Sequence, residues 1–102
     1  QASYRKTNAQ TIIKTVCDFY GISLNELLKK SRKTFLVKPR QIAMYLLRED
    51  TKASFPDIGS RLGGKDHSTV IHAYRKIIEK TDSDEGLKQE INLIRERIYN
   101  KA

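Results

Sequence analysis

The polar side chains best suited to chemistry in this chain are concentrated in residues 61–77, around a pair of glycines. Gly63 and Gly64 tolerate positive φ, so we expect them to end one helix and turn the chain into the next. Asp66 is a favourable N-cap, because its carboxylate can accept a hydrogen bond from the N–H two or three residues later. The residues after it place apolar side chains on one helical stripe and hydrogen-bonding groups on the opposite face. This arrangement is typical of the recognition helix of a helix-turn-helix.

The distribution of charge indicates the class of partner. The chain has 102 residues and a net charge of +8. Residues 1–78 contain 15 basic and 6 acidic side chains, whereas residues 79–102 contain 5 basic and 6 acidic ones. From Lys29 to Arg40 there are six basic residues and no acidic one. A scattered excess would only keep the surface solvated, but an excess segregated beside a recognition helix favours a polyanion, of which nucleic acid is the commonest.

Catalytic and metal-binding chemistry find little support in the sequence. No Ser/His/Asp or Cys/His set is suggested, and the glycines do not follow a strand as those of a phosphate-binding loop would. His67 and His72 are five residues apart, unlike the pair four apart that zinc-binding helices use. We therefore expect no catalytic residue, no metal ligand and no cofactor in this domain.

The single cysteine and the lack of long apolar runs indicate a cellular compartment. Cys17 has no cysteine to pair with, and it lies beside an apolar stripe, so we expect a small core residue in a reducing cytoplasm. No run approaches the ~20 apolar residues of a membrane span. Nothing at the N-terminus resembles a signal peptide. We therefore expect no membrane as a partner.

Helical periodicity explains nearly the whole chain, and no segment alternates as a strand would. Residues 1–7 have no apolar period and are expected to be loose. Residues 29–38 are predicted to be a basic loop tied to the core by Phe35, Leu36 and Val37, with Pro39 at the first position of the next helix. The fold class is therefore all-α, a single six-helix bundle-like domain over residues 1–102 that contains a helix-turn-helix with a preceding basic loop. The expected helices cover about 8–20, 23–28, 39–50, 54–62, 66–78 and 83–98.

Two motifs carry a family resemblance. The strings GGKDHSTVIHA at 63–73 and KPRQIAM at 38–44 resemble the C-terminal DNA-binding domain of the bacterial chromosomal replication initiators of the DnaA family. The resemblance covers nearly the whole chain and implies binding of double-stranded DNA at short origin boxes similar to TTATCCACA. It also implies that ATP belongs only to an N-terminal ATPase domain, to which residues 1–7 would lead. In isolation the domain would be a cytoplasmic, nucleoid-associated monomer whose DNA-binding surface could also meet regulatory proteins.

The resemblance assigns roles to individual residues. Arg32, in the basic loop, would enter the minor groove, where A·T-rich sequence concentrates negative potential. Three positions differ from the usual family residue, since Lys65 replaces an arginine, Ser68 a threonine and Phe55 a leucine. The residues implied to contact bases in the major groove are Lys65, Asp66, His67, Ser68, Phe55 and Pro56. The residues implied to contact phosphates are Arg40, Gln41, Arg48, Ser54 and Thr69.

Two alternatives remain open from the residues alone. A helix-turn-helix transcription regulator would share the geometry but bind a different operator, so origin boxes would bind no better than random duplex. A protein-interaction module would dock a replication regulator through the recognition helix or through the near-neutral last helix. Duplex DNA would then bind weakly or not at all.

Overall fold

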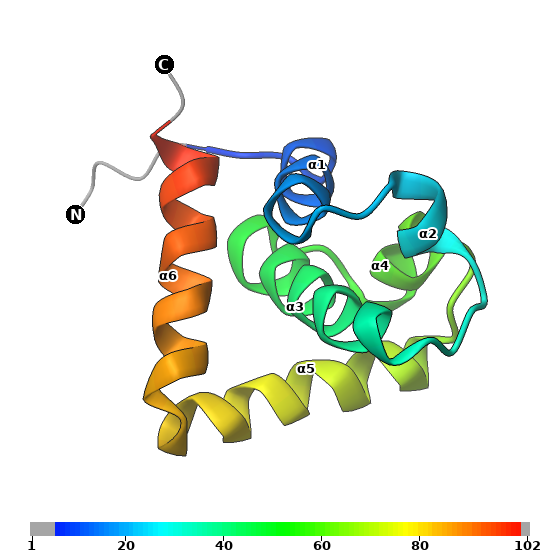
Figure 1. The fold of residues 1–102 in the computed structure, drawn as a ribbon. Coiled ribbons are helices and arrows are strands. Elements are labelled where there is room, and N and C mark those ends of the chain that lie inside the picture. Colours follow the sequence, from blue (N-terminus) through cyan, green and yellow to red (C-terminus); the bar gives the residue numbers. More distant parts are fainter. Residues whose placement is uncertain (1–5, 101–102) are drawn as a thin grey trace.

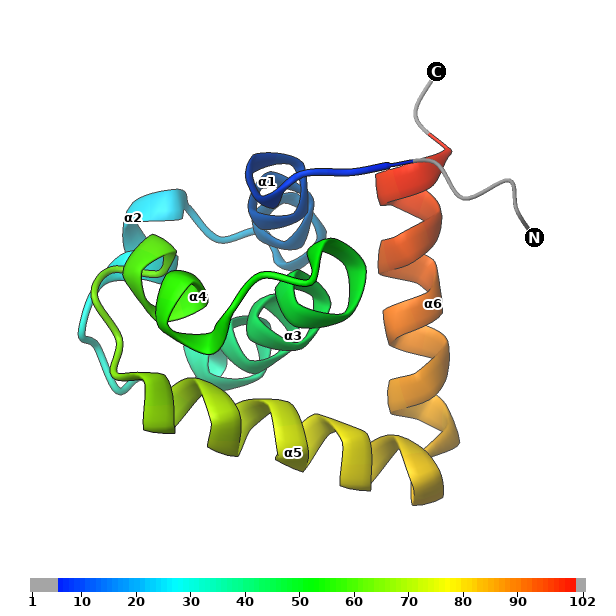
Figure 2. The ribbon, with the colours of Figure 1, turned by 180° about the vertical axis from the view of Figure 1, so that it is seen from behind.

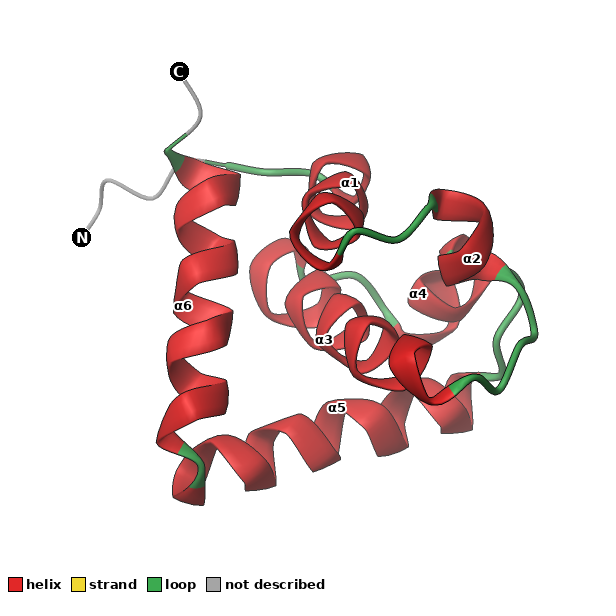
Figure 3. Cartoon of the chain, viewed as in Figure 1, coloured by secondary structure: helices red, strands yellow, loops and turns green. Residues whose placement is uncertain are grey.

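The computed structural model describes residues 6–100, and this part of the chain folds into six α-helices joined by short loops (Figures 1 and 3). The helices are α1 (Ala9–Tyr20), α2 (Leu24–Leu28), α3 (Thr34–Thr51), α4 (Phe55–Arg61), α5 (His67–Ser83) and α6 (Glu85–Tyr99). Helix α3 packs against α1, α2, α4 and α5, whereas α6 runs back from the end of α5 to pack on α1 (Figures 1 and 2). The predicted all-α fold with six helices is confirmed.

Polar side chains fix the starts of most of these helices. Asn8 accepts a hydrogen bond from the N–H of Thr11 at 2.8 Å, as an N-cap does. Ser23 and Glu26 form a reciprocal capping box at the start of α2. These bonds satisfy donors that the first turn of a helix leaves without partners, which is why the predicted starts are correct. The remaining side-chain caps are Ser54 for α4, Asp66 for α5 and Asp84 for α6.

The prediction for the start of α3 is wrong by five residues. The helix begins at Thr34, so the basic loop shrinks to residues 29–33 and Pro39 lies inside the helix. Pro39 removes one intrahelical N–H donor, but both Pro39 and Leu36 are buried, so apolar packing offsets that loss. Phe35 and Val37 are 53% and 43% exposed, so only Leu36 of the three predicted anchors reaches the core.

The core lies between α3 and the helices that surround it. Cys17 is buried there as predicted, and this burial raises the pKa of its thiol. Tyr74 is half-buried and stacks on Tyr45 with ring centroids 5.8 Å apart. The apolar side chains of Ile78 and Leu93 are exposed. None of the helices in residues 6–100 is both long enough and apolar enough to cross a bilayer.

The predicted lead-in falls almost entirely outside the part of the chain that the structure describes. Of residues 1–7, only Lys6 and Thr7 are described, and they precede α1 without forming a helix.

Candidate nucleic-acid interface

The turn between α4 and α5 is tight because of three glycines. Gly63 and Gly64 have φ values of 86° and 78°, in the region that favours glycine. Gly59, inside α4, accepts a hydrogen bond from the N–H of Lys65 at 2.8 Å. A Cβ at Gly59 would lie 2.1 Å from the carbonyl oxygen of Lys65, so the turn can fold back on α4 only where that side chain is missing. The predicted helix-turn-helix is therefore present, with α5 as its second helix.

The first turn of α5 presents polar groups to solvent, as predicted. Asp66 caps the helix by accepting a hydrogen bond from the N–H of Ser68 at 3.1 Å. Its side chain is 67% exposed and that of His67 is 57% exposed, with Nδ1 of His67 3.8 Å from Oδ1 of Asp66. Ser68 and Thr69 are also exposed. Four adjacent residues with different donors and acceptors thus project from one helix end.

The basic loop lies beside this turn although 30 residues separate them in the sequence. Figures 1 and 2 show from both sides that the loop after α2 and the loop before α5 run close together. A Cβ at Gly63 would lie 2.2 Å from the carbonyl oxygen of Leu28, which is the last residue of α2. The fold therefore brings Arg32 and the first turn of α5 onto one side of the molecule.

An open groove of about 1000 Å³ separates the basic loop from α5. Lys30 and Arg32 line it from the loop, and Arg40, with Gln41, lines it from α3. The α5 side and the turn before it add Lys65, Asp66, Ser68, Thr69 and His72. The lining thus carries four cations and one carboxylate, which makes it a positively charged groove suited to a polyanion.

Two of the groove's cations are already bonded within the protein. Arg40 donates hydrogen bonds to four backbone carbonyls of residues 26–31. Lys65 donates to the carbonyls of Leu28 and Leu62, each at 3.0 Å. Burial lowers the pKa of both groups, and the nearby positive charge of Arg40 lowers that of Lys65 further. Both head groups are therefore bonded to backbone carbonyls, although the two residues also line the groove.

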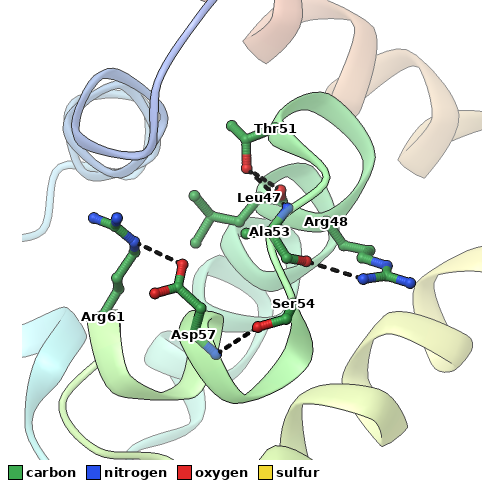
Figure 4. A network of polar contacts seen from close by, with 7 residues as sticks. All are labelled: Leu47, Arg48, Thr51, Ala53, Ser54, Asp57 and Arg61. Atoms are coloured by element: carbon green, nitrogen blue, oxygen red, sulfur yellow. Dashed lines mark hydrogen bonds and ion pairs between the residues drawn. The ribbon is translucent and has the colours of Figure 1, made fainter.

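The corner between α3 and α4 holds the other predicted contact residues, of which Figure 4 labels Arg48 and Ser54. Ser54 caps α4 by accepting from the N–H of Asp57 at 3.2 Å. Arg48 donates to the carbonyl of Ala53 at 3.0 Å and lies 4.3 Å from the ring centroid of Phe55. Phe55 is half-buried, whereas the next residue, Pro56, is exposed. None of Arg48, Ser54, Phe55 or Pro56 lines the groove. His67 does not line it either, although its neighbours Asp66 and Ser68 do. The predicted contacts therefore lie in the groove, at the α3–α4 corner and, for His67, on the exposed first turn of α5.

The groove also contains residues that were not among the predicted contacts. His72 lies one turn after Ser68 on the polar face of α5, so helical periodicity could have identified it. Val37 was assigned to the core because it is apolar. The other unpredicted lining residues are Lys30, Ser31, Met44, Gly64 and Ala73.

Comparison with known proteins gives consistent matches. The family model described as "Bacterial dnaA protein helix-turn-helix" matches residues 9–77. The chain is 47% identical over 94 residues to the chromosomal replication initiator protein DnaA of Chloroflexus aurantiacus, a match that covers 92% of this chain and 20% of that protein. The corresponding protein of Nitrosomonas europaea is 44% identical over 90 residues, covering 88% of this chain and 20% of that protein. The chain thus spans about a fifth of the length of the curated relatives it matches.

Two solved structures share the fold. The crystal structure of a DNA replication initiation factor matches with a TM-score of 0.79 and 28% identity, covering 90% of this chain and 28% of the other. AMPPCP-bound DnaA from Aquifex aeolicus matches with a TM-score of 0.70 and 29% identity, covering 88% of this chain and 26% of the other.

Proposed function

Because this chain belongs to the bacterial DnaA helix-turn-helix family, the DNA-binding part of the replication initiator, we propose that it binds double-stranded DNA sequence-specifically at short asymmetric boxes in the replication origin. One observation carries the proposal: the cationic groove opens beside the exposed first turn of α5, so that a loop and a helix end can meet the same duplex. Phosphate contacts would supply attachment, and base edges would supply specificity.

The first turn of α5 reads the major groove, which is wide enough to admit an α-helix. Asp66 accepts from the exocyclic amine of cytosine, while His67 and Ser68 contact neighbouring base edges. The exposure of these three side chains supports this role. At the α3–α4 corner, Phe55 and Pro56 make apolar contact with a thymine methyl group. Exposed Pro56 supports that contact more directly than half-buried Phe55 does.

A second set of residues fixes the position of the duplex. Arg32, exposed in the basic loop, enters the minor groove at the A·T-rich end of the box. Gln41, Arg48, Ser54 and Thr69 hold phosphates, and Thr69 lies in the first turn of α5, where the helix dipole favours an anion. If exposed cations of the basic loop bring the total to about 5–8 phosphate contacts, the log–log dependence of affinity on salt should have a slope of roughly −4 to −7.

The most direct test is selection of bound duplexes from a random pool at physiological salt. We expect recovery of a motif resembling TTATCCACA, and tight binding of that motif relative to a scrambled duplex of equal length and composition. Recovery of an unrelated operator would instead support a transcription regulator. Absence of any enrichment, with weak binding to all duplexes, would contradict DNA recognition and favour a protein-interaction module.

The cellular setting is part of the same proposal. The domain on its own binds one box as a monomer in the cytoplasm, associated with the nucleoid, and regulatory proteins compete for the same surface. ATP binding and assembly belong to the part of the full-length relatives that this chain does not span. The residues of this domain hold no cofactor and perform no catalysis in this proposal.

A further inference from the structure

Arg40 holds the carbonyl end of α2 and the loop that follows it. A short helix ends with backbone carbonyls that lack intrahelical donors, and α2 ends at Leu28 without a glycine cap. Arg40 reaches them from α3 and uses four of its five N–H groups. Its acceptors are the carbonyl oxygens of Glu26 (2.9 Å), Leu27 (2.9 Å), Lys29 (2.6 Å) and Ser31.

Lys65 binds the same stretch from the turn before α5. Its ammonium has three donors, and it lies 3.0 Å from the carbonyl oxygens of both Leu28 and Leu62 and 3.4 Å from that of Lys29. Leu62 is the C-cap of α4, so this one group joins the ends of two helices. The carbonyl of Lys29 receives both Lys65 and Arg40.

The two cations connect the two parts of the proposed interface. Ser31, which Arg40 holds, directly precedes Arg32 in the minor-groove loop. Lys65 directly precedes Asp66, the cap of α5. The spacing between Arg32 and the first turn of α5 therefore depends on bonds that meet at residues 28–31.

We propose that Arg40 and Lys65 form an internal clamp that sets the spacing between the minor-groove loop and the recognition helix, and that they are positioning residues rather than direct DNA contacts. The inference rests on the proposed function and gives these two residues a role different from the one that the family resemblance implies. Moving either head group to a phosphate or a guanine would leave partly buried carbonyls without donors, which carries a desolvation cost. A free arginine or lysine nearby would bind the polyanion without that cost.

A first test needs no DNA. Hydrogen exchange is measured on Lys65→Met and on the matched control Lys76→Met, which removes an exposed cation of α5. We expect faster exchange of the amides of Leu27 and Lys29, which donate to the carbonyls of Ser23 and Asn25, for Lys65→Met, because the end of α2 loses its hold. Exchange in α6 should be unchanged, and Lys76→Met should change neither region. Unchanged exchange of the Leu27 and Lys29 amides in a folded Lys65→Met variant would overturn the clamp while leaving the proposed DNA binding intact.

A second test separates positioning from direct contact. Affinity is measured for the box, for a box with G·C pairs at its A·T-rich end, and for a box with 7-deazaguanine, which lacks the N7 acceptor. We expect Lys65→Met, like Arg32→Ala, to reduce discrimination at the A·T-rich end on the order of tenfold, and to keep the 7-deazaguanine penalty of the wild type. Loss of that penalty with unchanged A·T discrimination would show a direct guanine contact and overturn the clamp. If the wild type itself fails to distinguish the box from random duplex, the proposed function fails, and the exchange experiment still decides the clamp.

Arg40→Lys provides an independent variant if Lys65→Met does not fold. It keeps a charge that could hold a phosphate but loses the planar fork that reaches four carbonyls. We expect weaker A·T discrimination with an unchanged salt slope. Full retention of A·T discrimination would overturn the clamp and support the phosphate role.

Discussion

Arg95 of α6 donates two hydrogen bonds from its guanidinium to the carboxylate of Asp50 of α3. Nη2 lies 2.8 Å from Oδ1, and Nε lies 3.3 Å from Oδ2. The side chain of Asp50 is only 8% exposed, so the carboxylate needs these donors. This pair attaches α6 to the same helix that supplies Arg40 and Arg48 to the proposed interface.

Asp50→Asn should lower the free energy of unfolding by about 2 kcal/mol, because it leaves Arg95 partly buried without its counter-charge. Urea denaturation monitored by circular dichroism measures this. Asp18→Asn is the control, since its pair with Lys14 is exposed on both sides and should contribute less than about 0.5 kcal/mol. Equal losses in the two variants would show that burial does not strengthen the Asp50 pair.

The carboxylate of Asp50 also makes the stability of the folded domain vary with pH in the alkaline range. Tyr99 donates to Oδ2 of Asp50 at 2.6 Å. Burial, with this hydrogen bond and the charge of Asp50, raises the pKa of Tyr99 to about 12 from an ordinary 10. The neutral phenol is thus favoured in the folded state, so its contribution is complete below pH 10 and is lost as pH rises toward 12.

Tyr99→Phe should therefore be less stable than the wild type at neutral pH, by about 1 kcal/mol. The difference in free energy of unfolding should shrink between pH 10 and 12, because the wild type loses the Tyr99–Asp50 hydrogen bond, which the variant lacks at every pH. Denaturation of both proteins across this range measures it, and lysine titration affects both alike. A difference that stays constant up to pH 12 would argue against the Asp50 bond.

Alanine substitutions at Gly63 and Gly64 can be compared directly, because both glycines lie in the turn between α4 and α5. Alanine at either position must adopt positive φ, at a cost of about 1–2 kcal/mol. Only at Gly63 would the new Cβ meet the Leu28 carbonyl, whereas Gly64 has open space around it. Gly63→Ala should therefore be less stable than Gly64→Ala by at least about 1 kcal/mol in urea denaturation. Similar stabilities would mean that the turn does not press on α2.

His67→Ala should weaken binding to the box by ~1–3 kcal/mol and leave binding to random duplex nearly unchanged. His72→Ala makes the same change of residue type beyond the first turn of α5, and its effect should be smaller. Fluorescence anisotropy with labelled duplexes measures both. An equal loss on box and random DNA for His67→Ala would remove it from base recognition.

Arg48→Ala should weaken box and random duplex together, because a phosphate contact carries no sequence information. The salt dependence of binding should flatten by a slope of about 1. Arg75→Ala, an exposed cation of α5 outside the groove lining, is the control and should leave the slope unchanged. A defect confined to the box would assign Arg48 to base recognition instead.

The features that the sequence predicts correctly depend on local chemistry. The caps at Asn8 and Ser23 and the exposed first turn of α5 follow from residues a few positions apart. The start of α3 depends instead on tertiary burial of Leu36 and Pro39, which outweighs the signal that proline usually gives.

The partners of Arg40 and Lys65 could not have been predicted from the sequence. A backbone carbonyl is a hydrogen-bond acceptor at every residue, so no residue type marks the end of α2 as the target of these two cations. Distance in the chain adds to the difficulty, since 37 positions separate Lys65 from Leu28. The groove could be predicted as two separate lists of polar residues, but their closeness arises from tertiary contacts, namely the packing of α2 on the glycine turn and the bonds of Arg40 and Lys65 to residues 26–31.

The burial of the chain's single thiol makes site-directed labelling straightforward. Cys17 is 6% exposed, and burial favours its protonated form over the reactive thiolate. A cysteine introduced at an exposed surface position would therefore be modified by a maleimide probe in preference to the native one. Fluorophores or spin labels placed on the basic loop and on α5 could then report the distance between them, free and on DNA, in an otherwise unaltered protein.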